Sequence, residues 1–422
     1  MTEPATPAYV GAVQPHDAYA ALRHRGFRWY IVSLFVMVVG SQLQAVVVGW
    51  QVYNLTHDPL SLGLIGLAEA LPFIAVALPA GYLADRRDRR IISVASLFVL
   101  ACCSATLLGL SATPGLLSRV GVYPVYATIF VSGIARGILQ PARQALSAEI
   151  VPRIIYQNAI AWRSSTWQTA SVIGPAIGGL LYGFSGSFAS YAAATVAMLV
   201  ALSAFLMVRY EPVPRELRTD SMFAELVTGL RFVWSEHAIL AALSLDLFSV
   251  FLGGAEALLP VFASEILKVG PQGLGLLRAA PAAGAVTMGI FLAHRPPFTR
   301  AGRTMLLAVA VFALAIVGFG LSRSFYLSLA LLALSGMADN VSVVIRSTLI
   351  QLLTPAQMLG RVSAVNSIFI GSSNELGAFE SGVAARLLGA VRAVVLGGSA
   401  ALAVVGLTAR LVPRLRTLGR IA

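Results

Sequence analysis

Several ionisable side chains lie inside stretches of sequence that are otherwise apolar enough to cross a membrane. They are Glu69, Arg136, Asp246, Arg278, Asp339, Glu375 and Glu380. An ionised Asp or Arg at the centre of a membrane helix costs about 3 kcal/mol on insertion scales, so these side chains are not expected to face lipid. Burial makes a carboxylate hold its proton more tightly, and a neighbouring arginine weakens that hold. Carboxylates whose surroundings alternate between these conditions can load and release protons, so the pattern predicts a proton-coupling and substrate cavity.

The depth of each carboxylate in its apolar stretch indicates how well it suits this role. Asp339 and Glu375 lie near the middle of their stretches and are the strongest candidates, whereas Glu256 lies nearer to one membrane surface. A second interpretation stays open for every residue of the set, namely a fixed ion pair. Asp339, for example, could pair with Arg346, which follows it in the same apolar stretch.

The composition is that of a multi-pass membrane protein. The chain has 422 residues, of which 58% are hydrophobic and 11% charged, and its mean hydropathy is +0.82. A soluble domain carries about twice that charge. The net charge of +12 does not indicate a nucleic-acid partner, because the arginines cluster in alternate connections between apolar stretches, as expected for loops on the cytoplasmic side.

Signals for enzymatic or cofactor chemistry are missing from the sequence. There is no Gly-x-x-x-x-Gly-Lys loop for nucleotide hydrolysis, so transport would be secondary. No histidine falls inside an apolar stretch, which argues against a metal site in the membrane. Cys102 and Cys103 are adjacent and do not suit a structural disulfide. We therefore predict no cofactor, no metal and no enzymatic activity.

Hydropathy predicts twelve membrane spans in an all-α protein. Their ranges are 29–53, 61–83, 91–111, 124–142, 161–183, 187–208, 238–262, 273–293, 304–321, 326–350, 362–388 and 391–411. The predicted organisation is a cytoplasmic tail (1–28), a six-helix bundle (29–208), a cytoplasmic linker (209–237), a second six-helix bundle (238–411) and a second cytoplasmic tail (412–422). The linker carries apolar residues at helical spacing and favours an amphipathic helix on the membrane surface, although a plain linker stays open.

The two predicted bundles repeat each other in sequence. Ser-Gly-Ile-Ala-Arg at 132–136 matches Ser-Gly-Met-Ala-Asp at 335–339, an offset of 335 − 132 = 203, and the same offset pairs Gly179 with Gly382. A second offset, 281 − 72 = 209, pairs Gly66 with Gly275, Glu69 with Arg278 and Pro72 with Pro281. Six-plus-six parallel repeats predict two bundles that rock about a substrate site near the middle of the membrane.

A dense run of charges follows the second predicted span, in Gly-Tyr-Leu-Ala-Asp-Arg-Arg-Asp-Arg-Arg at 81–90. This run resembles the loop between the second and third helices of the major facilitator superfamily, with Asp88 where that family usually has glycine. The resemblance implies the major facilitator fold over 29–411. We further hypothesise a latch at the cytoplasmic gate in which Arg143 pairs with Asp85. The predicted gate residues are Gly81, Asp85, Arg86, Arg89, Arg90 and Arg143.

A second motif, Ala-Ser-Val-Ile-Gly-Pro-Ala-Ile-Gly-Gly at 170–179, lies in the fifth predicted span. Small residues four apart allow close helix packing, and the proline permits a bend. The motif resembles one associated with exporters and antiporters of the same superfamily, with Ala170 replacing its first glycine. Its key residues are Gly174, Pro175, Gly178 and Gly179. By the same resemblance, Arg136 would be a membrane-embedded arginine linked to proton coupling.

Amide and aromatic side chains in the spans suit amphipathic organic solutes rather than phosphates. The predicted cavity-lining residues are Gln42, Gln44, Trp50, Trp167, Asn366 and Asn374. The segment 359–382 resembles the branch of the superfamily that exports siderophores and macrolide-type drugs.

Together these features predict a proton-coupled antiporter that exports amphipathic small molecules by rocker-type alternating access. We expect a monomer in the bacterial inner membrane with both termini in the cytoplasm. Its partners would be a small-molecule substrate, protons and the lipid bilayer, without nucleic acid. A flippase for lipids or lysolipids and a proton-symport importer are the alternatives among transporters. A membrane scaffold or sensor is the alternative from another class.

Overall fold

The computed structural model describes residues 17–113, 115–210, 222–296, 298–355 and 358–412, and the regular elements within these ranges are helical. The first half contains η1 (Ala21–Arg23), α1 (Arg25–Thr56), α2 (Pro59–Arg86), α3 (Arg89–Ala112), α4 (Leu116–Val120), α5 (Tyr123–Glu149), η2 (Arg153–Ile155) and α6 (Tyr156–Leu206). A further helix, α7 (Met222–Ser235), leads into the second half. The second half contains α8 (His237–Leu252), η3 (Glu256–Leu258), α9 (Leu259–Val261), η4 (Phe262–Ile266), α10 (Gly270–Ala293), α11 (Ala301–Leu321), α12 (Phe325–Leu353), α13 (Leu359–Leu388) and α14 (Ala390–Leu411).

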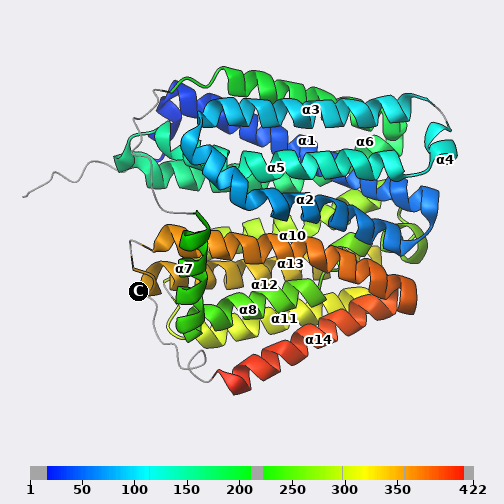
Figure 1. Ribbon diagram of the computed structural model, residues 1–422. Helices are drawn as coiled ribbons and strands as arrows, with labels where there is room; N and C mark the ends of the chain where they lie inside the picture. Colours follow the sequence, from blue (N-terminus) through cyan, green and yellow to red (C-terminus); the bar gives the residue numbers. More distant parts are fainter. Residues whose placement is uncertain (1–16, 114, 211–221, 297, 356–357, 413–422) are drawn as a thin grey trace, which may run out of the picture.

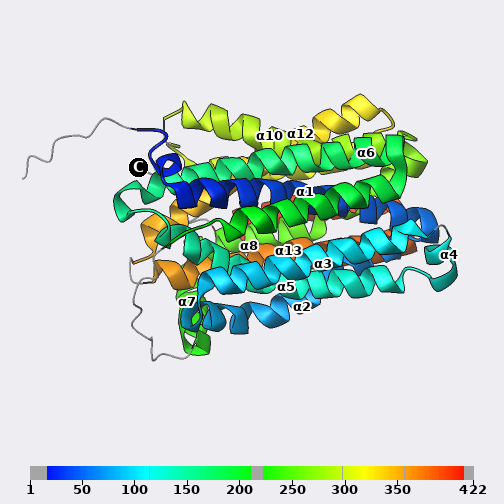
Figure 2. The ribbon, with the colours of Figure 1, turned by 90° about the horizontal axis from the view of Figure 1, so that it is seen from above.

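The long helices run side by side in two bundles, one above the other in Figure 1. Helices α1, α2, α3, α5 and α6 form the N-terminal bundle, and α8 and α10 to α14 form the C-terminal bundle. Helix α7 lies across one end of the molecule and α4 lies at the other, as Figures 1 and 2 both show. We call these ends the α7 end and the α4 end.

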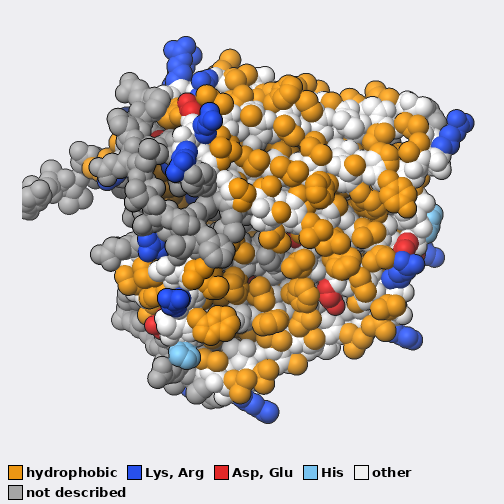
Figure 3. All heavy atoms as spheres, viewed as in Figure 1, with side chains coloured by type: hydrophobic (Ala, Val, Ile, Leu, Met, Phe, Trp, Pro, Cys, Tyr) orange, Lys and Arg blue, Asp and Glu red, His pale blue; other side chains and the backbone are white. Residues whose placement is uncertain are grey.

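The lengths and compositions of the helices are those of a multi-pass membrane protein. Within the described residues, nine helical segments are long and apolar enough to cross a membrane. One of them contains Gly186, whose φ of 75° breaks α6 into two consecutive spans. With α5 and α13, these segments are consistent with the twelve predicted spans. Apolar atoms cover much of the flank in Figure 3, and Lys and Arg side chains gather near the two ends. The predicted all-α membrane fold is confirmed.

Aromatic side chains fill the centre of each bundle. In the N-terminal bundle the Phe27 and Tyr30 rings of α1 stack with centroids 5.9 Å apart, and Phe205 of α6 packs on Tyr30. In the C-terminal bundle the ring centroids of Phe262 and Phe319 lie 4.6 Å apart. These residues are fully buried, so each bundle has a close-packed aromatic core of its own.

Glycines allow the two bundles to touch along two helix pairs. A Cβ atom on Gly382 of α13 would lie 2.7 Å from the Gly63 Cα of α2. A Cβ atom on Gly179 of α6 would lie 2.6 Å from the Gly275 Cα of α10. The repeat offset of 382 − 179 = 203 relates Gly179 to Gly382, so one residue of each contact occupies an equivalent position of the internal repeat. Their partners are one helical turn out of register, because the second offset pairs Gly275 with Gly66 rather than with Gly63. Both contacts lie in the half of the molecule nearer to the α4 end, because α2 and α10 begin at that end.

The aspartate that departs from the loop motif caps a helix. Asp88 precedes α3, and its carboxylate accepts a hydrogen bond from the Arg90 backbone N–H at 2.7 Å. The Tyr210 hydroxyl donates to the same carboxylate at 2.6 Å. An aspartate is among the most favourable residues at the first position of a helix. Asp88 therefore stabilises the start of α3, a position at which glycine is also tolerated.

Helix α7 falls within the predicted linker. Its buried Val233 packs with Ile239 and Leu243 of α8. A Cβ atom on Gly229 would lie 2.9 Å from the backbone oxygen of Arg361, so α7 also packs closely on the start of α13. The Trp234 side chain is 66% exposed. Helix α7 is thus attached to the C-terminal bundle by one face.

Candidate functional site

An ion pair joins α2 and α5 inside the N-terminal bundle. The Arg136 guanidinium donates to the Glu69 carboxylate, and both side chains are partly exposed. Gly133, one turn before Arg136, makes this possible, because a Cβ atom there would lie 2.7 Å from the Glu69 backbone oxygen. The two helices therefore approach closely enough for short side-chain contacts. The interhelical ion pair that the sequence left open is present for Glu69.

Glu375 brings a further carboxylate to the boundary between the bundles. It lies on α13, and its Oε2 atom is 3.8 Å from the position that a Cβ on Gly66 of α2 would occupy. The charges close enough to act on Glu375 are Glu69, Arg136, Arg278 and Glu256. Four of the predicted residues, Glu69, Arg136, Arg278 and Glu375, thus form one group, which we call the interface cluster. Its members come from α2, α5, α10 and α13, so its electrostatics depend on how the bundles meet.

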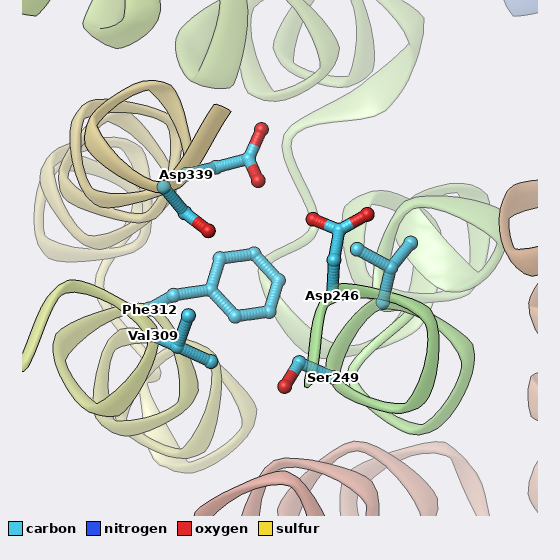
Figure 4. Close-up of a pocket in the computed structure, with 7 residues that line it drawn as sticks. Asp246, Ser249, Val309, Phe312 and Asp339 are labelled. Carbon is cyan, nitrogen blue, oxygen red and sulfur yellow. The ribbon is translucent and has the colours of Figure 1, made fainter. Parts of the chain in front are cut away.

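A second ionic group lies inside the C-terminal bundle. Asp246 of α8 forms an ion pair with Arg346 of α12, and their side chains are 9% and 3% exposed. Asp339 lies near this pair, and both aspartates border a small cavity together with Phe312 (Figure 4). The ion-pair partner of Arg346 is therefore Asp246 and not Asp339. Seven residues along a helix correspond to about 10 Å, which makes a pair within α12 less favourable than one across to α8.

Two polar contacts join the bundles at the α4 end. The Tyr53 hydroxyl of α1 donates to the Glu265 carboxylate of η4. Arg386 of α13 lies 3.4 Å from Asp58, which precedes α2. A cavity of about 390 Å³ borders Tyr53, Glu265 and Arg392. The sequence analysis did not identify these contacts, although each residue lies at or just beyond the end of an apolar stretch on the same predicted side.

Comparison with known families assigns the chain to one of them. The family model for transmembrane secretion effectors of the major facilitator superfamily matches residues 16–420. The chain belongs to this family. It is a transporter of the drug and siderophore exporter branch, so the predicted family and the prediction that it is not an enzyme are confirmed.

Relatives and solved structures agree with this assignment. The enterobactin exporter EntS of Escherichia coli O1:K1 is 29% identical over 347 residues, with 81% of each chain covered. EntS of Shigella boydii serotype 18 is 28% identical over the same length. A peptide-bound POT family transporter has a TM-score of 0.73 at 11% identity, covering 93% of this chain and 96% of that one. A bacterial homolog of the human lysosomal transporter Spinster, inward-facing and unoccupied, has a TM-score of 0.67 at 14% identity, covering 93% and 99%.

The exporter-type motif of this major facilitator protein packs on two neighbours. Gly174 and Gly178 let α6 lie on α1, because Cβ atoms there would be 2.9 Å from the backbone oxygens of Val39 and Leu43, respectively. Gly179 faces α10 of the other bundle. The Pro175 backbone oxygen lies 2.6 Å from the position of a Cβ on Gly275, also on α10. The motif therefore links the core of one bundle to the boundary with the other.

The predicted lining residues of this transporter lie in different surroundings. Gln42 packs against Gly174, and Gln44 accepts a hydrogen bond from the Ser104 hydroxyl at 2.6 Å, inside the N-terminal bundle. Trp50 is only 7% exposed and belongs to an apolar cluster that includes residues of the other bundle. Asn366 is half-buried, and its Oδ1 has no hydrogen-bond partner among the described residues. Asn374 is exposed and Glu380 half-buried.

The predicted gate residues are held mainly within the N-terminal bundle. Arg89 forms an ion pair with Glu149 at 2.7 Å, and Arg90 donates to the Leu206 backbone oxygen at 2.6 Å. Arg86 is exposed and Gly81 half-buried, both near the end of α2.

Arg143, the predicted latch partner, lies among aromatic and sulfur-bearing side chains. Its guanidinium carbon is 5.7 Å from the centroid of the Trp167 ring, and its Nη1 is 3.5 Å from the Met37 sulfur. The Asp85 side chain lies outside the described residues, so the predicted latch between Asp85 and Arg143 stays a prediction.

Proposed function

We propose that this transporter exports amphipathic small molecules in exchange for protons, by alternating access between its two bundles. The observation that carries the proposal is the position of Glu375. Its carboxylate lies at the boundary of the bundles, within the field of Glu69, Arg136 and Arg278. Rocking of the bundles changes the distances among these four charges. The proton affinity of Glu375 would change with them, which is the requirement for coupling.

The orientation in the membrane follows from the arginines. The connection 86–90 between α2 and α3 lies towards the α7 end and carries four arginines. A bacterial inner membrane with the α7 end and both termini in the cytoplasm fits the excess of basic residues in cytoplasmic loops. The contacts at the α4 end would then hold the external side closed. In that state, substrate and proton exchange would be directed to the cytoplasm.

The driving force is sufficient for export. One proton that crosses about 100 mV supplies roughly 2.3 kcal/mol, and a difference of one pH unit adds about 1.4 kcal/mol. Together these amounts support a concentration ratio of a few hundredfold for a neutral solute. The relatives named enterobactin exporters favour a siderophore-like substrate for this chain. We propose that the monomer is the transporting unit.

The test is substrate flux in proteoliposomes. Purified protein is reconstituted with enterobactin as the first substrate, and a pH gradient is imposed at zero membrane potential. We expect the gradient to accumulate substrate in vesicles containing wild-type protein. Glu375→Gln should lose accumulation but keep downhill exchange, because the neutral amide mimics a permanently protonated carboxyl. Glu236→Gln is the matched control, since Glu236 lies at the α7–α8 junction, away from the interface cluster.

Two results would contradict proton coupling. One is accumulation by Glu375→Gln that equals wild type under the same gradient. The other is a wild-type protein that exchanges substrate downhill but does not respond to the gradient. Transport of lysolipids by the reconstituted protein, with no flux of enterobactin, would favour the flippase alternative.

A further inference from the structure

A small polar cavity lies within the C-terminal bundle. It has a volume of about 10 Å³, and its lining residues all come from α8, α11 and α12. They are Asp246, Ser249, Val250, Val309, Phe312, Asp339 and Ser342. In Figure 4 the carboxylates of Asp246 and Asp339 turn toward the same gap, beside the Phe312 ring. The cavity is thus separate from the interface cluster, to which the N-terminal bundle contributes.

Two serines of this cavity leave their hydroxyl groups unpaired. Ser249 is 2% exposed and Ser342 is 1% exposed. Neither Oγ atom has a hydrogen-bond partner within the described part of the chain. Other buried serines on these helices behave differently, since the Ser335 hydroxyl donates to the Leu332 backbone oxygen at 2.7 Å. Buried polar groups are almost always paired, so the unpaired Ser342 hydroxyl at the cavity is available to a bound species.

The charges of the two lining aspartates and of Arg346 sum to one negative unit. Asp246 and Arg346 neutralise each other in their ion pair. Asp339 has no ion-pair partner among the described residues and adds one negative charge when ionised. Glu256, exposed at the start of η3, is the other acidic group close enough to act on Asp339. One net negative charge suits a monovalent cation, whereas a divalent ion would leave an uncompensated positive charge.

We propose that this cavity binds a sodium ion. The oxygen atoms available to it are those of the Asp339 carboxylate, the Asp246 oxygen that does not face Arg346, and the Ser342 hydroxyl. The Ser249 hydroxyl points away from the carboxylates in Figure 4. Hard cations prefer oxygen ligands of this kind. A cavity of about 10–15 Å³ holds one water-sized species, and a bare sodium ion is no larger. Phe312 and Val309 close the remaining walls, which favours a dehydrated ion.

Bound sodium would link α8 to α12, because oxygen atoms from both helices would coordinate the same ion. The site is distinct from the proton exchange proposed above, because its ligands lie in one bundle and do not depend on the bundle boundary. Sodium binding can therefore hold or fail independently of proton coupling.

The experiment is a thermal-unfolding titration of the purified full-length protein. NaCl is raised against choline chloride at constant ionic strength, and binding of ²²Na⁺ is measured in parallel. We expect a saturable rise of at least about 2 °C in the unfolding temperature with sodium. Bound ²²Na⁺ should approach one ion per chain.

Variants test the assigned ligands. Asp339→Asn and Ser342→Ala should each weaken sodium binding by about tenfold or more, because the first removes the net charge and the second removes an oxygen ligand. Ser335→Ala is the matched control, since this buried serine lies on α12 but does not border the cavity. It should keep the wild-type response to sodium.

Three results would overturn the proposal. The first is an equal response of the wild-type protein to sodium and choline, which would assign the cavity to a water molecule. The second is an unfolding temperature that varies with pH but not with sodium, which would assign Asp339 to a proton alone. The third is undiminished ²²Na⁺ binding in Asp339→Asn. If a variant does not fold, the wild-type comparison of sodium with choline still decides.

Discussion

The glycine contact between α6 and α10 gives the sharpest test of how the bundles move. A Cβ atom on Gly179 would lie 2.4 Å from the Pro271 backbone oxygen and 2.6 Å from the Gly275 Cα. Both neighbours are backbone atoms, so no side chain can rotate away. We therefore expect Gly179→Ala to force the two helices apart at this point, which lies in the half of the molecule nearer to the α4 end.

The size of the effect follows from this geometry. Carbon atoms pack at about 3.5–4.0 Å, so α6 and α10 must separate by about 1 Å to accept the methyl group. Inserting a methyl group into a well-packed site costs about 1–3 kcal/mol. The cost applies only while the bundles stay packed at the α4 end. It therefore shifts the conformational equilibrium away from the packed state by roughly 5- to 150-fold.

Distances between spin labels can measure this shift. Asn54 of α1 and Leu387 of α13 are exposed near the α4 end, one on each bundle. Labels are placed on cysteines at these positions, after Cys102 and Cys103 have been replaced. In Gly179→Ala we expect the distance distribution to gain a population with longer separations. The same labels in the unmodified background should report mainly the short separation.

The control is a helix glycine with free space around it. Gly406 on α14 has no neighbouring atom within 4 Å of an added Cβ. Gly406→Ala should leave the distances unchanged and stabilise the protein by up to about 1 kcal/mol, because glycine is a poor helix former. The reasoning fails if Gly179→Ala also leaves the distance distribution unchanged, since α6 would then have absorbed the methyl group locally.

The remaining predictions concern single side chains. Arg346→Met should destabilise the protein by about 3–5 kcal/mol in thermal unfolding, because it leaves Asp246 as an unpaired buried charge, and adding Asp246→Asn should recover most of the loss. Asp88→Ala should cost about 1 kcal/mol more than Asp88→Gly, because both variants lose the hydrogen bond from Tyr210 but glycine is tolerated as a helix cap, and equal losses would rule out the cap. Tyr53→Phe should weaken closure of the α4 end by about 1 kcal/mol, since it removes the hydrogen bond to Glu265, and the spin labels above would detect it.

Hydropathy predicted the spans well because a helix that crosses lipid must be apolar over a fixed length. The predicted first span, 29–53, lies inside α1 (Arg25–Thr56), because a helix continues into the polar region beyond the hydrocarbon. The predicted seventh span, 238–262, is interrupted in the structure. Helix α8 ends at Leu252 and a short helix resumes at Glu256, with Gly253 and Gly254 near the break. Hydropathy does not detect such a break, since two near-neutral glycines barely lower the mean hydropathy of an apolar stretch.

The partners of the buried charges could be predicted only in part. The sequence identified Asp246 and Asp339 as charges at membrane depth. It suggested Arg346 as a partner of Asp339, because both residues lie in the same apolar stretch. Only the packing of α8 against α12 makes Asp246 the partner of Arg346. The unpaired hydroxyls of Ser249 and Ser342 could not be predicted either, because a serine in a membrane helix usually bonds to its own backbone.

The internal repeat conserves the backbone contacts but inverts the charges placed on them. Glu69 on α2 and Arg136 on α5 form an ion pair in the N-terminal bundle. The repeat offsets of 209 and 203 place Arg278 on α10 and Asp339 on α12 at the corresponding positions, with opposite signs. Among the described residues no ion pair joins Arg278 and Asp339. Arg278 instead lies close enough to act on Glu375, and Asp339 borders the cavity with Asp246. The same helix packing therefore holds a neutral pair in one bundle and separates the charges in the other, so we expect ion binding to depend mainly on the C-terminal bundle.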